Sequence, residues 1–74
     1  MKDNVVRHVK ELTINETWVR YFDPEGKPRK ALVKGFDLQA NLVTSLQFRG
    51  DSKPTKVNCP PTNLRKIPRP EGGL

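Results

Sequence analysis

One cysteine, Cys59, and one histidine, His8, are present in the 74 residues of this chain. A disulfide needs two cysteines, and a structural zinc site needs four nitrogen or sulfur ligands. A chain of this size buries only about 60% of the surface that its unfolded state exposes, so small domains are often stabilised by such a device or by oligomerisation. We therefore expect one small domain without a disulfide, metal or cofactor, or an oligomer that completes its core.

Basic side chains outnumber acidic ones by fourteen to eight, which gives a net charge of +6. Residues 1–22 contain four basic and three acidic side chains, whereas residues 23–74 contain ten and five. The excess of +5 in the second part favours polyanions, of which nucleic acid is the commonest in a cytoplasm. Charge does not distinguish RNA from DNA, and solubility is the competing explanation for it.

The first residues have a helical pattern. Apolar side chains follow the spacing i, i+1, i+4 and i+7, at Val5, Val6, Val9 and Leu12. This spacing predicts a short helix over about residues 4–12 that lies on the rest of the fold. The segment lacks the apolar stretch of a signal peptide, and no apolar run approaches the roughly 18 residues of a membrane span. We expect a soluble, cytoplasmic protein.

From Thr17 onward the pattern changes to a period of two, which is typical of strands. We expect strands over residues 17–22, 30–36, 42–48, 55–59 and 65–67. The first strand would have Thr17, Val19 and Tyr21 on one face and Trp18, Arg20 and Phe22 on the other, and the third would have Leu42, Thr44, Leu46 and Phe48 on one face. Tyr21 and Phe22 are expected in the core, while the place of Trp18 is left open.

The fold class is therefore mainly β, a short N-terminal helix followed by a five-stranded, strongly bent antiparallel barrel. One domain is expected over residues 1–68, with the barrel from about residue 17, and a flexible tail over residues 69–74. The candidates are SH3-like barrels, including the KOW and Tudor types, the Sm fold and the OB-fold. The OB-fold is the least favoured, because the place of its helix holds only a turn.

The stretch GKPRKALVKGFDLQANLV, residues 26–43, resembles the first sequence motif of the Sm and LSm proteins. The matching positions are Gly26, Gly35, Phe36, Asp37, Asn41, Leu42 and Val43. Gly35 would allow the second strand to bend sharply enough for a small barrel. The N-terminal helix is also similar to this family, including its bacterial Hfq branch.

The resemblance implies a ring of five to seven identical subunits that binds single-stranded, U-rich RNA. Asn41 would hydrogen-bond a uracil edge and Asp37 would orient Asn41, while the fourth strand of one subunit would pair with the fifth of the next. Lysine and arginine side chains near the motif are candidate phosphate ligands. The candidate RNA-binding residues are Phe36, Asp37, Gln39, Asn41, Arg49, Lys27, Arg29, Lys30 and Lys34.

The sequence departs from the family pattern at two places, and two alternative interpretations stand beside the resemblance. Gln39 stands where the family usually has a residue that stacks on the base, and the pair Arg49-Gly50 comes earlier than the second family motif. Asp37 and Asn41 are also common turn residues whose side chains bond nearby backbone amides. The alternative function is a monomeric SH3-, Tudor- or KOW-like module for protein or nucleic-acid interaction in transcription or phage–host control.

Catalysis finds no support in the sequence. The chain has no Ser-His-acid set, no Cys-x-x-Cys pair and no phosphate-binding glycine loop ending in Gly-Lys. Cys59 is expected to be a small buried apolar side chain. We therefore expect a binding protein and not an enzyme.

Overall fold

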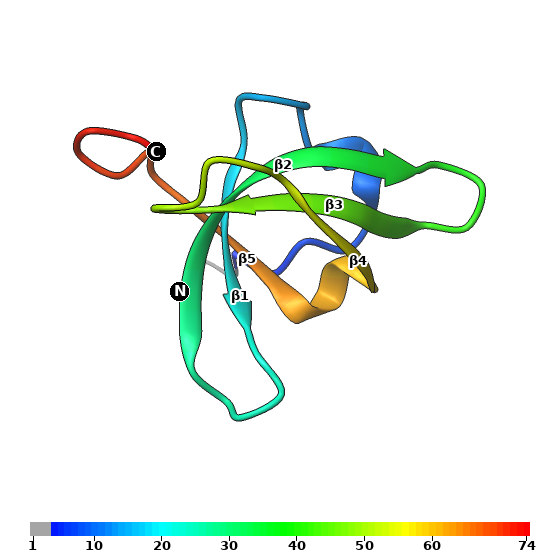
Figure 1. The fold of residues 1–74 in the computed structure, drawn as a ribbon. Helices are drawn as coiled ribbons and strands as arrows, with labels where there is room; N and C mark the ends of the chain where they lie inside the picture. The colour runs from blue at the N-terminus through cyan, green and yellow to red at the C-terminus, as the bar shows by residue number, and fades with distance from the viewer. Residues whose placement is uncertain (1–3) are drawn as a thin grey trace.

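The computed structural model describes residues 4–74, and its main feature is one five-stranded antiparallel sheet. The strands are β1 (Trp18–Phe22), β2 (Pro28–Asp37), β3 (Leu42–Phe48), β4 (Thr55–Cys59) and β5 (Leu64–Ile67). Their order in the sheet is β4-β3-β2-β1-β5, so the chain meanders through four strands and then returns beside the first (Figure 1). Within the described residues no strand pairing joins β4 to β5, and the sheet is unclosed. The mainly β class is confirmed.

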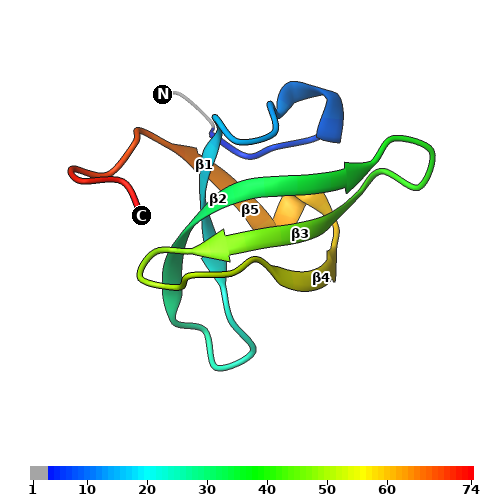
Figure 2. The same ribbon diagram turned by 45° about the horizontal axis from the view of Figure 1, so that its top comes forward.

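The N-terminal segment differs from the expected helix. Val9–Glu11 form a single 3-10 turn, η1, which His8 caps by accepting a hydrogen bond at Nδ1 from the Lys10 amide at 3.1 Å. Val5 forms a β-bridge with Arg65, and the Val6 amide donates to the Leu64 carbonyl at 3.3 Å. Residues 4–6 therefore lie along β5, as the dark blue trace in Figure 2 shows. Valine disfavours helix and suits an extended chain beside a strand edge.

The turn between β1 and β2 is built by the residues that the sequence indicates for a turn. The Asp23 carboxylate accepts hydrogen bonds from the backbone amides of Glu25 and Lys27 at 3.0 and 2.7 Å. Gly26 has a φ of +85°, which glycine adopts without steric cost. A second 3-10 turn, η2 (Pro61–Asn63), connects β4 to β5 where Pro60 and Pro61 end the strand.

Gly35 interrupts the second strand. The register between β2 and β3 shifts on both sides of this residue, so it lies in an irregularity of the sheet, as expected from the sequence. A methyl group at this position would lie 3.2 Å from Thr44 Oγ1. A further shift between Val43 and Ser45 places Val43 in the core instead of Thr44, so the expected common face of residues 42, 44, 46 and 48 holds only for Leu46 and Phe48.

The core lies on one face of the curved sheet and is closed by the N-terminal segment. It consists of Val6, Val9, Leu12, Val19, Ala31, Val33, Val43, Leu46, Phe48, Cys59 and Leu64. Tyr21 packs against this cluster, with its ring centroid 5.5 Å from that of Phe48. Phe22 was expected in the core, but it is 44% exposed, because it lies on the opposite face of β1.

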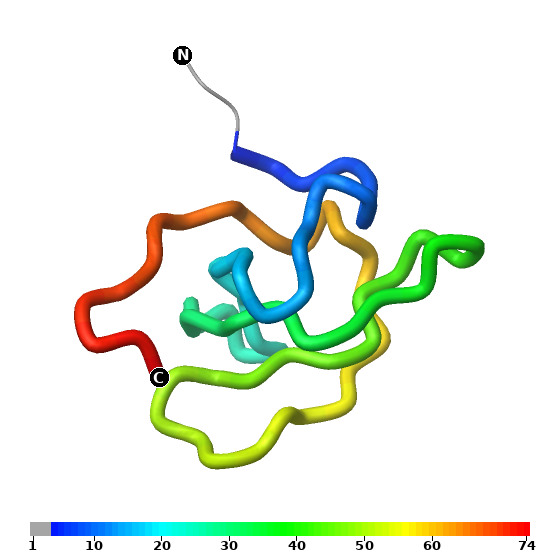
Figure 3. Tube along the Cα trace, turned by 90° about the horizontal axis from the view of Figure 1, so that it is seen from above, coloured from blue at the N-terminus to red at the C-terminus, as the bar shows by residue number. Residues whose placement is uncertain are grey.

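The C-terminal residues fold back over the outer face of the sheet, which is the face opposite the core. The Arg49 guanidinium donates to the carbonyls of Glu71 and Gly73 at 2.8 and 3.2 Å. Trp18 and Leu32, cross-strand neighbours on this face, are buried, and the end of the chain lines a hollow beside them. Figure 3 shows this segment returning toward the turn after β3. The flexibility expected for residues 69–74 stays a prediction.

Candidate nucleic-acid interface

The loop from Asp37 to Asn41 is held by its own side chains. The Asp37 carboxylate accepts hydrogen bonds from the backbone amides of Gln39 and Ala40 at 3.0 and 3.2 Å. This is an Asx-type turn, in which the carboxylate replaces a backbone acceptor. The Gln39 side chain is exposed, whereas Phe36 is half-buried and packs against the core. Asp37 therefore shapes the loop.

Asn41 connects this loop to the N-terminal segment. Its side-chain oxygen accepts a hydrogen bond from the Val9 amide at 2.9 Å, and its side-chain nitrogen lies 3.4 Å from the Arg7 carbonyl as a donor. Its φ is +54°, a left-handed conformation that asparagine tolerates better than most residues. Both polar atoms of the amide thus have partners within the chain, so reading a uracil edge would require these contacts to be exchanged.

The expected basic cluster on β2 is divided between the two faces of the sheet. Arg29 lies on the core side, with its guanidinium carbon 4.1 Å from the centroid of the Phe48 ring, whereas Lys30 points to the outer face. Lys34 Nζ donates to the Asn15 side chain. Lys27 lies in the turn, 3.9 Å from the Glu25 carboxylate, and both side chains are exposed. Adjacent strand residues alternate between faces, so a run of basic residues in sequence is not one surface.

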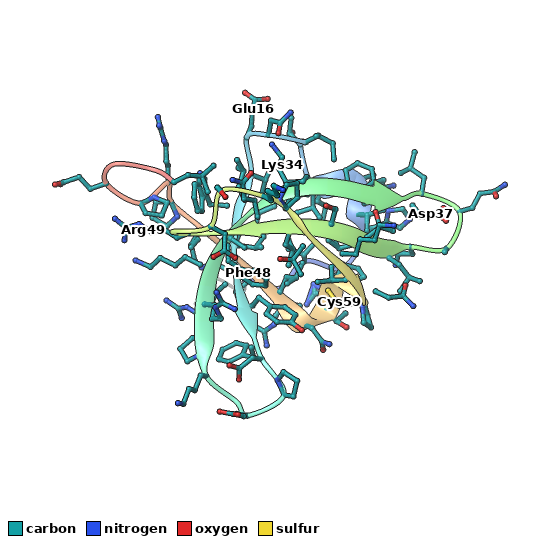
Figure 4. The ribbon with its side chains drawn as sticks, viewed as in Figure 1. Glu16, Lys34, Asp37, Phe48, Arg49 and Cys59 are labelled. Carbon is teal, nitrogen blue, oxygen red and sulfur yellow. The ribbon has the colours of Figure 1, made fainter. Side chains whose placement is uncertain are left out.

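The predicted site residues also lie at two ends of the same hairpin. Asn41 precedes β3 and Arg49 follows it, and a seven-residue strand at about 3.3 Å per residue is roughly 20 Å long. Figure 4 shows Asp37 in the loop at one end of β2 and β3 and Arg49 at the opposite end, beside the C-terminal segment. The structure therefore does not bring the loop residues and Arg49 into one site.

The register of three neighbouring strands assembles a different basic surface. Arg20 on β1 lies directly opposite Lys30 on β2 and directly opposite Arg65 on β5. All three point to the outer face, because their strand neighbours Val19, Ala31 and Leu64 belong to the core. We call Lys30, Arg20 and Arg65 the basic row. Arg49, whose amide bonds the Lys30 carbonyl at 2.9 Å, continues this row on the turn after β3.

No ion pair within residues 4–74 involves the basic row. The Arg65 guanidinium donates to the carbonyls of Thr62 and Leu64 at 2.9 and 3.2 Å, and these neutral acceptors leave its charge uncompensated. Directly opposed side chains in a sheet have Cβ atoms about 5 Å apart, and like-charged side chains in such a pair are destabilising. Sequence reasoning included Lys30 but missed Arg20 and Arg65, which are far apart in the chain.

An exposed aromatic ring lies next to the basic row. Phe22 follows Arg20 by two residues on β1 and therefore points to the same outer face. A hollow of about 490 Å³ is lined there by apolar and basic residues: Phe22, Ile67, Pro68, Arg20, Arg65 and Lys66. Asn4 contributes the one further polar side chain, and none of the lining residues is acidic. The site thus combines cations with an aromatic surface.

A metal centre and a reactive thiol were also sought in the described part of the chain. Residues 4–74 contain no group of three histidine, cysteine, aspartate or glutamate side chains that could hold a metal ion. Burial raises the pKa of the Cys59 thiol, which opposes formation of a thiolate. No helix among the same residues is long and apolar enough to cross a membrane.

Comparison of the chain with protein-family models, with curated proteins and with solved structures finds no match.

Proposed function

We propose that this chain is a small Sm-like β-barrel protein that binds single-stranded RNA, and that the basic row is its phosphate-binding surface. The observation that carries the proposal is the register of Arg20, which places this side chain between two other cations on the outer face without a neighbouring acid. A phosphate backbone would neutralise all three charges together, and the choice of RNA follows from the resemblance of residues 26–43 to the Sm family.

The balance of charge effects supports a ligand in preference to a structural role. Three cations in register weaken the sheet, because opposed like charges repel across neighbouring strands. They would strengthen the binding of a polyanion, because each neutralised phosphate releases condensed counterions. A surface that weakens the free fold and improves binding is expected where function has set the sequence.

The salt dependence of oligo-U binding tests the proposal. For single strands, the logarithm of the association constant falls with the logarithm of salt concentration by about 0.7 for each phosphate contact. Three contacts predict a slope of roughly −2 between about 50 and 300 mM salt. Lys30→Ala should weaken oligo-U and oligo-A equally and reduce the slope by about 0.7.

Lys10→Ala is the matched control, because Lys10 is an exposed lysine on η1, outside the basic row. It should leave both the affinity and the slope close to those of the wild type. A flat salt dependence, or no RNA binding by the wild type, would contradict the proposal.

Assembly into a ring of five to seven subunits belongs to the same proposal. The two edges of the unclosed sheet are β4 and β5, the strands that pair between neighbouring subunits in the Sm family. In the single chain, however, residues 4–6 already lie along β5 through the bridge between Val5 and Arg65. A ring that uses this pairing requires the segment to leave β5.

The same bridge favours the second candidate, a monomeric SH3-like interaction module. Covering the β5 edge satisfies backbone groups that would otherwise promote pairing with another chain. Light scattering at tens of micromolar protein, with and without oligo-U, separates the two. A mass of five to seven subunits supports the ring, and a monomer under both conditions supports the module.

A further inference from the structure

Phe22 is the one aromatic residue among the large exposed apolar side chains of residues 4–74. The other four aromatic residues are in the core or buried: Trp18 and Phe48 are 4% exposed, and Tyr21 and Phe36 pack against the core cluster. Nothing in the packing of the core requires an aromatic ring at position 22, because its side chain is on the outer face. The ring of Phe22 is therefore accessible to a ligand.

The surroundings of Phe22 fit a nucleotide. Its cross-strand neighbour is Pro28, a flat apolar residue without a backbone donor. Arg20 and Arg65 come next along the same hollow, and Ile67 and Pro68 line its other end, because Ile67 lies opposite Trp18. Its volume of about 490 Å³ falls within the range of roughly 300–1,000 Å³ that small-molecule sites have. An exposed ring with Pro28 on one side and cations on the other matches a base and its phosphate.

We propose that Phe22 is a stacking platform for one unpaired base, whose flanking phosphates lie on the basic row. The inference rests on the proposed function and adds a site of discrimination to it, because the basic row alone reads only phosphate charge. Stacking on Phe22 requires a base whose flat face is free. In duplex RNA the faces of the bases are covered by the neighbouring base pairs. Single-stranded RNA would thus be preferred over duplex RNA at this surface.

This placement also accounts for Gln39. The Sm-like motif would put the stacking residue in the loop after Asp37, where an exposed glutamine stands instead. Phe22 would supply the stacking surface that the loop lacks. It lies opposite Pro28, at the other end of β2 from the loop, and next to the cations. Base stacking and phosphate binding then occur at one surface.

The experiment compares two ligands of equal length and charge, oligo-U and an abasic strand with the same phosphate backbone. Wild-type protein should bind oligo-U about 5- to 150-fold more tightly, the range that corresponds to the loss of one stacked base when an aromatic residue is replaced. Phe22→Leu keeps an apolar side chain but removes the ring. It should lower oligo-U affinity to the level of the abasic strand and leave the salt slope unchanged.

Two further variants control the interpretation. Phe22→Trp keeps an aromatic surface and should retain the preference for oligo-U. Leu38→Ala removes an apolar side chain that is 59% exposed in the loop at the other end of β2, and it should change neither affinity. Thermal melts of each variant confirm that the fold is intact, which is expected because both substituted side chains are exposed.

The outcomes distinguish a failure of the inference from a failure of the proposed function. If wild-type protein binds both strands equally with a steep salt dependence, phosphate binding stands and the stacking platform is refuted. If Phe22→Leu weakens both strands alike, the ring supports the surface and does not stack on a base, which also refutes the inference. If the wild type binds neither strand, the proposed function and the inference fail together.

Discussion

Replacing Arg20 with glutamine is expected to stabilise the fold while it weakens RNA binding. Arg20 lies opposite Lys30 on one side and Arg65 on the other, so the substitution removes two like-charge contacts at once. Cross-strand pairs are worth a few tenths of a kcal/mol up to about 1 kcal/mol, so the free energy of unfolding should rise by about 0.5–1 kcal/mol. In a domain of this size, 1 kcal/mol corresponds to a rise in melting temperature of about 4–8 °C.

Salt supplies an internal check on the cause. The screening length is about 10 Å at 0.1 M salt and about 3 Å at 1 M, so the repulsion between neighbouring strands fades over this range. Urea unfolding at both concentrations should show the gain from Arg20→Gln at low salt and a much smaller gain at 1 M. Oligo-U binding, measured at low salt, should fall for the same variant.

Lys27→Gln is the matched control for Arg20→Gln. Lys27 lies outside the basic row, in an exposed turn and 3.9 Å from the Glu25 carboxylate. Its replacement should change the unfolding free energy by less than about 0.5 kcal/mol, without the increase that is expected for Arg20→Gln. If Arg20→Gln is no more stable than the wild type at low salt, or gains equally at 1 M salt, the repulsion argument is refuted.

Three other predictions address the loop, the tail and the thiol. Asn41→Ala should lower the unfolding free energy by about 1–3 kcal/mol in urea titrations, because the Val9 amide loses its partner and alanine must adopt a φ of +54°. Asn41→Gly should lower the unfolding free energy by less, because glycine tolerates that φ. Arg49→Ala should release the C-terminal segment from the outer face, and the emission of Trp18, the one tryptophan of the chain, should shift to longer wavelength. Burial raises the pKa of Cys59 above its value in the unfolded chain, so the unfolded state loses the thiol proton first. The unfolding free energy should therefore fall as pH rises above about 9, and Cys59→Ala should remove this fall.

The strands could be predicted from the sequence because their signals are local. Alternation from Thr17 onward, the turn residues 23–26 and the proline pair after Cys59 each fix a boundary within a few residues of where the structure has it. The N-terminal segment could not be predicted in this way. The valines at positions 5, 6 and 9 satisfy a helical spacing, but the free edge of β5, about 60 residues later in the chain, offers Val5 and Val6 backbone partners that no local pattern reveals.

For the same reason, only part of the candidate site could be predicted from the sequence. Lys27, Arg29, Lys30 and Lys34 form a cluster in sequence, yet strand alternation puts Arg29 and Lys30 on opposite faces. The basic row depends on the register of β1 with both β2 and β5, which no single segment specifies. Alternation in β1 does place Arg20 and Phe22 on one face, and this was the one sequence signal that could have indicated the surface.

The bridge between Val5 and Arg65 has a consequence for how the chain acquires its structure during synthesis. Its two residues are 60 positions apart in the sequence, and β1 likewise pairs along one edge with β5, which is made much later. Closing such long loops carries an entropic cost before any contact compensates it, and β proteins with distant pairings fold in milliseconds to seconds. Until β5 has been made, β1 therefore stays unpaired along one edge, and the pairing of β5 with β1 and with residues 4–6 is a late step in folding.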